Sequence, residues 1–230
     1  MRTEAYNAFT RPIAAVRESA RWTVALAVCL VVCALALGIS ATAQTIITFD
    51  PPGSVLTEAI AINNSGTITG GYLDANNLAH GFVRSSNGAI TSFDVPGQGT
   101  QSGQGVNGAD SINPRGEITG FYTDDGYVFH GYLRAREGSF VTFDAPGAGT
   151  GYLQGTFPQN INPAGVIAGQ YFDASNVRHG FVRASDGTIT SFDAPSAGTG
   201  PGQGTIPAGA DGLNPAGVIT GAYINIGSRR

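Results

Sequence analysis

The chain has 230 residues, of which 34 are glycine, 12 are proline and 12% are charged, and this length can bury a sizeable core in one or two domains. Its formal net charge is −4. High glycine content, few charges and the lack of a long helix-forming stretch beyond residue 43 indicate many turns and therefore short strands. An acidic chain with scattered arginines lacks the basic face that a phosphate backbone requires, which argues against nucleic-acid binding.

The first 43 residues have the three parts of a secretory signal peptide. Arg17 and Arg21 precede an apolar run over residues 23–39, and Ala41-Thr42-Ala43 follows it. Signal peptidase has shallow pockets that require small residues at two such positions. We therefore expect cleavage after Ala43 and a protein that is secreted or periplasmic, exported from a bacterium. An uncleaved anchor is the alternative, because about 17 apolar residues is near the lower limit for a membrane span.

Cleavage would remove both cysteines, Cys29 and Cys33, which lie inside the apolar run. The remaining domain, residues 44–230, would then have neither a thiol nor a disulfide. It carries 8 arginines against 14 acidic residues. We expect contact with a membrane only through the leader, if that segment stays uncleaved.

The domain from residue 44 onward repeats with a period of about 50 residues. An Asn-x-x-Gly segment, a His-Gly-aromatic-aliphatic-Arg segment and a Phe-Asp pair recur in this order. Full repeats are expected over about 57–97, 107–147 and 156–196, and a half repeat over 208–225.

Each repeat is predicted to contain four short strands. In the first repeat these end at Asn63, cover residues 67–72, begin at His80 and end at Phe93. Turn residues separate them: Asn and Gly at 63–66, Asp and Asn at 74–77, and Asn-Gly at 87–88. Asn, Asp and Gly favour turns because they tolerate positive φ or bond their own backbone.

Four antiparallel strands in about 50 residues are typical of a β-propeller blade. The predicted fold class is therefore all-β, a propeller-like array of four-stranded antiparallel blades after an N-terminal hydrophobic signal helix. The Gly-rich linkers over residues 95–108 and 194–209 are either paths between blades or flexible surface loops.

Closure of the array is not determined by the sequence. The segment Thr45 to Asp50 matches a fourth strand, so together with the half repeat it makes a blade without a third strand. The alternatives are an open partial propeller, a stack of β-sheets, and closure by a second chain. Exposed strand edges at both ends would favour self-association.

These motifs resemble the HAF-type extracellular repeat of bacteria. The resemblance rests on the His-Gly-Phe triplet followed by Arg, on Gly-x-Ile-Thr-x-Phe-Asp-x-Pro-Gly, and on Ile-Asn-x-x-Gly-x-Ile-x-Gly-x-Tyr, and it covers about Thr45 to Tyr223. The middle residue of the triplet is Gly here, where the family name has Ala. The resemblance implies an exported repeat protein with no assigned activity and no catalytic residues to carry over.

The only histidines of the chain, His80, His130 and His179, occupy one repeat position. In a ring they could form a three-His metal site only if their strand lined the central channel. Their strand is the third of each unit and lies nearer the rim. We therefore expect each histidine to hydrogen-bond within its own blade.

The carboxylates of the Phe-Asp pairs also recur, as Asp50, Asp94, Asp144 and Asp193. Two carboxylates could catalyse glycoside hydrolysis if their environments differed enough to separate their pKa values. These four have near-identical surroundings, so turn capping is the expected role. The segment Asp124-Asp125-Gly126 is acidic, but it lacks the ligand spacing of a hand-type calcium loop.

No nucleophile elbow, phosphate loop, zinc helix or dinucleotide fingerprint occurs in the sequence. The sequence thus predicts no catalytic, cofactor-binding or metal-ligating residues. We expect a non-enzymatic binding or interaction module of unknown ligand. The alternative is a glycan-binding or glycan-active propeller in which Tyr72, Tyr122 and Tyr171 are stacking platforms.

Overall fold

The computed structural model describes residues 45–207 and 212–225. The signal peptide expected over residues 1–43 lies outside them. The chain divides into two compact units, Met1–Thr48 and Phe49–Arg230, and every strand of the described residues lies in the second. Within the described part, no helix is long and apolar enough to cross a membrane.

The described residues are all-β, as the repeat chemistry predicts, and four strands in each full repeat confirm the proposed unit. The first repeat contains β1 (Ser54–Ile62), β2 (Ile68–Asp74), β3 (Ala79–Arg84) and β4 (Ile90–Phe93). The second contains β5 (Gly105–Ile112), β6 (Ile118–Thr123), β7 (Phe129–Arg134) and β8 (Phe140–Phe143). The third contains β9 (Gly155–Ile161), β10 (Ile167–Phe172), β11 (Arg178–Arg183) and β12 (Ile189–Phe192). The half repeat supplies β13 (Gly204–Pro207) and β14 (Gly221–Ile224).

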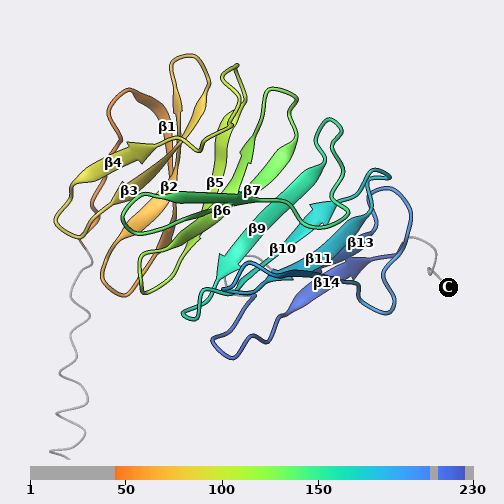
Figure 1. Ribbon diagram of the computed structural model, residues 1–230. Coiled ribbons are helices and arrows are strands. Elements are labelled where there is room, and N and C mark those ends of the chain that lie inside the picture. The colour runs from red at the N-terminus through yellow and green to blue at the C-terminus, as the bar shows by residue number, and fades with distance from the viewer. Residues whose placement is uncertain (1–44, 208–211, 226–230) are drawn as a thin grey trace, which may run out of the picture. The chain divides into compact units, whose positions relative to one another are not determined.

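Within a repeat the four strands form an antiparallel meander, in which β1 pairs with β2, β2 with β3, and β3 with β4. Consecutive repeats are joined by one parallel bridge, such as Ala79 opposite Gly105. The path through the array runs from β1 to β14 without closing. Figure 1 shows these two strands at opposite ends of the array, one in orange and the other in blue. The array is therefore open, which was one of the three alternatives.

The turn after the first strand of each repeat is built on one asparagine. The Asn63 side-chain oxygen accepts hydrogen bonds from the backbone N–H groups of Ser65 and Thr67, while Gly66 takes a φ of +76°. The Asn63 amide also donates to the backbone carbonyl of Asn113 at 3.2 Å. Asn113 donates to Asn162 at 3.3 Å, and Asn162 to Asn214 at 3.4 Å. This asparagine ladder ties each repeat to the next.

The hydrophobic core lies between consecutive repeats. Between the first and second repeats, Phe93 and Val95 pack with Ile112, Ile118 and Tyr132. Between the second and third, the core contains Ala145, Ile161, Ile167, Tyr171 and Phe181. Each repeat therefore needs a neighbour to bury its apolar face, as in other repeat proteins.

The Phe of each fourth strand links two repeats. Phe93 meets Tyr132 edge-on at 6.2 Å between ring centroids, and the Arg134 guanidinium lies 5.0 Å from the Phe93 ring centroid. The same ring covers Gly81 of its own repeat, so closely that a Cβ atom there would overlap it. This overlap explains why the middle residue of the His-Gly-aromatic triplet is glycine.

The Gly-rich linkers are held in place by buried glutamines. Gln104 is fully buried; its side-chain oxygen accepts from the Gln101 N–H, and its amide donates to the Asp125 carbonyl. Gln154 repeats the pattern with Gly151 and Ala174. The linker over residues 95–108 is thus a path between two repeats that buried side-chain hydrogen bonds hold in place.

The segment Thr45 to Asp50 is not a strand, contrary to the sequence prediction. Phe49 nevertheless has the contacts of a fourth-strand Phe, since its ring lies 5.8 Å from Phe82 and 4.7 Å from the Arg84 guanidinium carbon. Without a preceding third strand to pair with, the segment keeps the side-chain packing and loses the ladder hydrogen bonds.

Candidate functional site

Each histidine bridges two carboxylates of its own repeat. The Nδ1 atom of His80 lies 2.6 Å from Asp94, and its Nε2 atom lies 3.9 Å from Asp74. The corresponding distances are 3.0 and 3.4 Å in the second repeat and 2.9 and 3.5 Å in the third. The expectation that each histidine bonds within its own blade is confirmed.

The two carboxylates of each bridge have different roles. One Asp74 oxygen accepts from the backbone N–H groups of Asn76 and Leu78, both at 2.8 Å, and so builds the turn before β3. Those backbone bonds, Leu78 first, lower the Asp74 pKa. Asp94 instead faces His80 from the end of β4. Turn capping was thus the wrong role for Asp94, Asp144 and Asp193, which bond the histidines.

The imidazole charge is best defined in the second repeat. The pKa of His130 is raised, first by its hydrogen bond to Asp144, against the opposing effect of burial. With both ring nitrogens near carboxylates, the protonated imidazole is the favoured form. Within the described ranges, no group of three or more His, Cys, Asp or Glu side chains is placed to hold a metal ion. The bridge therefore fastens the second turn to the fourth strand.

A tyrosine from the second strand stacks on each histidine. Ring centroids are 5.0 Å apart for Tyr72 and His80, 5.2 Å for Tyr122 and His130, and 4.9 Å for Tyr171 and His179. Tyr122 and Tyr171 are each only 6% exposed. Buried rings cannot offer a face to a sugar, so the glycan hypothesis loses these two stacking platforms.

The acidic segment of the second repeat is also explained by local bonds. Asp124 accepts from the N–H groups of Gly126 and Val128, both at 2.8 Å. Asp125 accepts from the Thr100 N–H at 3.4 Å and so contacts the preceding linker. These two aspartates hold a turn and a linker, which accounts for their presence without calcium.

Asp110 in β5 is a candidate that the sequence analysis missed. Burial raises its pKa to about 7, and its negative charge is one cause of the raised pKa of the buried Tyr132. When the repeats are aligned on the ladder asparagines, Asp110 stands where the other full repeats have Ile60 and Gln159. The half repeat, however, has Asp211 at this position, so the alignment does not mark Asp110 as a departure from the repeat.

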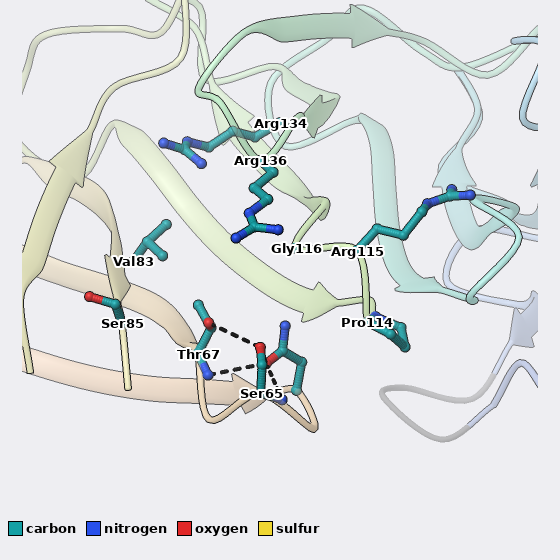
Figure 2. Close-up of a pocket in the computed structure, with 10 residues that line it drawn as sticks. Ser65, Thr67, Val83, Ser85, Pro114, Arg115, Gly116, Arg134 and Arg136 are labelled. Carbon is teal, nitrogen blue, oxygen red and sulfur yellow. Dashed lines mark hydrogen bonds between the residues drawn. The ribbon is translucent and has the colours of Figure 1, made fainter. Parts of the chain in front are cut away.

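A pocket of about 320 Å³ lies between the first and second repeats, near the turns that carry the asparagine ladder. Figure 2 shows Arg134 and Arg136 on one side of it and the hydroxyls of Ser65 and Thr67 on the other. Arg115 extends away from them, and its guanidinium binds Glu117 at 2.6 Å. The pocket offers cationic donors and hydroxyls but no carboxylate, imidazole or thiol, so it lacks an acid–base pair.

Comparisons with known proteins identify no relative. No family model, no curated protein and no solved structure matches this chain.

Proposed function

We propose that the protein is an exported, non-enzymatic interaction module that binds through the open face of its first repeat. The observation that carries this proposal is the exposure of Ile62. It is 67% exposed, whereas Ile112 and Ile161 at the same repeat position are 9% and 7% exposed. The three isoleucines are equivalent in the sheet: Ile62 pairs with Ile68, Ile112 with Ile118, and Ile161 with Ile167.

The rest of β1 shares this exposure. Val55 is 68% exposed, Leu56 50% and Ile60 40%. Exposed apolar residues that gather on one strand are typical of a surface that binds another protein. In the later repeats the preceding repeat covers this face, because β1 and β2 both pack against β5.

The partner that fits this face is a second copy of the chain. In a head-to-tail stack, β13 and β14 of one copy would pack against β1 of the next copy, just as β1 and β2 pack against β5 within one chain. It would also extend the asparagine ladder. Among the described residues no asparagine amide donates to the Asn63 carbonyl, and the Asn214 amide would reach that carbonyl in the second copy. Such a contact is heterologous and builds a ring or a filament.

The absence of an enzymatic role is supported by the arrangement of the polar side chains. Histidine, tyrosine and both aspartates take the same geometry in three repeats and bond one another. Catalytic acids and bases need different environments, and identical copies do not provide them. The signal-like leader and the resemblance to HAF-type repeats support export.

Sedimentation velocity of the exported chain over a concentration series tests the proposal. Association should strengthen with concentration, and Ile62→Asp should weaken it at least tenfold. Val141→Asp is the control, because Val141 is 51% exposed on β8, away from the open face. A monomer at every concentration, or equal weakening by both variants, would contradict binding through this face. A turnover signal from a glycan and ester hydrolase screen would contradict the non-enzymatic role.

A further inference from the structure

Among the described residues, nothing pairs with the outer edge of β14, at the place where every full repeat carries a third strand. β2, β6 and β10 each pair with two strands, the first and the third of their repeat. Within residues 45–207 and 212–225, β14 pairs with β13 alone. Natural edge strands are usually protected by a charge or a proline. The sequence of β14, Gly-Ala-Tyr-Ile, has neither.

Phe192 lacks the two contacts that its equivalents make. Phe49, Phe93 and Phe143 each meet the third-strand aromatic of the following repeat at 5.8 to 6.2 Å between centroids. An arginine two residues after that aromatic lies 4.7 to 5.0 Å from the same three rings. Among the described residues, no aromatic ring or guanidinium takes these places at Phe192.

A cavity of about 160 Å³ lies next to Phe192, and its lining includes Ala194, Ile206, Ile219 and Tyr223. An apolar cavity on the order of 150 Å³ is large enough for a benzene ring. Tyr223 is 52% exposed, against 6% for Tyr122 and Tyr171, and among the described residues no histidine stacks on its ring. The free edge, the unpartnered Phe192 ring, the cavity and the uncovered Tyr223 all mark the place of one missing strand.

We propose that this edge is an acceptor site for a β-strand of another polypeptide with the pattern His-x-aromatic-x-Arg. The register of the third repeat, in which Gly169 faces Phe181 and Tyr171 faces His179, defines the pose. The incoming aromatic lies opposite Gly221 and enters the cavity against Phe192. The incoming histidine stacks on Tyr223.

The chemistry of the site selects this kind of strand. Backbone hydrogen bonds to β14 supply affinity for any extended chain, and side-chain pockets supply specificity. The cavity takes a ring, and the Phe192 face takes a guanidinium. The acceptor site is the edge of β14, whereas the proposed head-to-tail contact places β13 and β14 against β1 of a second copy, so the two proposals use different parts of the same end of the array.

A synthetic peptide with the sequence of residues 176–184 and blocked termini tests the proposal. The exported chain should bind it with a dissociation constant below about 100 μM, and a second peptide carrying Phe181→Ser should bind at least tenfold more weakly. Hydrogen exchange should show new protection of the β14 amides at 221–224. Equal binding of both peptides, no binding at millimolar peptide, or protection elsewhere would overturn the proposal.

A pair of variants checks the same site from the acceptor side. Phe192→Ala should weaken binding of the first peptide at least tenfold. Thr190→Ala is the control, since Thr190 is exposed on the same strand, and it should bind as the unmodified chain does. Should Phe192→Ala unfold the half repeat, the comparison of the two peptides on the unmodified chain still decides. Loss of self-association in Ile62→Asp with unchanged peptide binding would show that binding at the β14 edge does not require the contact made by β1.

Discussion

Replacing Gly81 by alanine should destabilise the protein because of one ring. A Cβ on Gly81 would overlap two Phe93 ring atoms, and even the third-nearest, Cε1, would lie 2.8 Å away. Carbon atoms normally pack at about 3.5 to 4.0 Å. The Phe93 ring would therefore have to retreat by about 1 Å and lose its fit to Tyr132 and Phe140.

The size of the effect follows from two opposing contributions. Overpacking of a filled core costs about 1–3 kcal/mol, and replacing glycine by alanine in a strand regains about 0.5–1 kcal/mol. We expect a net loss of about 1–2 kcal/mol in the free energy of unfolding. Urea denaturation followed by circular dichroism measures it.

Two comparisons make the Gly81 experiment specific. Gly71 faces Gly81 across the strand pair, and a Cβ there would meet its nearest atom at 3.5 Å, so Gly71→Ala should be neutral or slightly stabilising. In a Phe93→Ala background, Gly81→Ala should lose most of its cost. The same cost with and without the Phe93 ring would refute the steric explanation.

Three further predictions concern buried polar groups. The raised pKa of Asp110, about 7 against 3.8, means that its contribution to stability is lost as pH rises from about 4 through 7. Asp110→Asn should remove this pH dependence of the free energy of unfolding and stabilise the chain at pH 8 by at most about 4 kcal/mol. An unchanged pH profile of unfolding in the variant would contradict the prediction. The pKa of His130 is raised, so its protonated imidazole stabilises the folded chain at pH values below the pKa that the group has in the unfolded chain. His130→Asn should therefore cost more free energy of unfolding near pH 5.5 than near pH 9 in the same denaturation assay. Gln104→Ala should lower the free energy of unfolding by about 1–3 kcal/mol and speed proteolysis within residues 95–104. Gln101→Ala should do neither. If protease leaves residues 95–104 uncut in both variants, Gln104 does not hold the linker.

The strands were predictable because turn-forming residues mark where each strand ends. Asn63 and Gly66, with their equivalents, mark the first turn of each repeat, and period-two apolar patterns fill the gaps between turns. The strand number per repeat and the antiparallel order follow from these local signals. The ordering of the linkers did not follow, since it depends on Gln104 reaching across to Asp125, 21 residues away.

The side-chain contacts of the candidate site were only partly predictable. A histidine at a repeated position predicts a structural role, but its partner 14 residues later, such as Asp94 for His80, depends on the pairing of β3 with β4. The burial of Tyr122 depends on the neighbouring repeat. The sequence shows an aspartate at position 110, but the raised pKa of Asp110 depends on its burial, which the sequence does not show.

The asparagine ladder and the linker glutamines bond only to adjacent repeats. The ladder bond therefore recurs at each junction between neighbouring repeats, and each of these bonds involves only the two repeats that it joins. A gene duplication or deletion of one whole repeat would therefore keep both new neighbours compatible. Chain length in such an array is a heritable variable separate from the repeat sequence, and selection can adjust the reach of the molecule without redesigning its core.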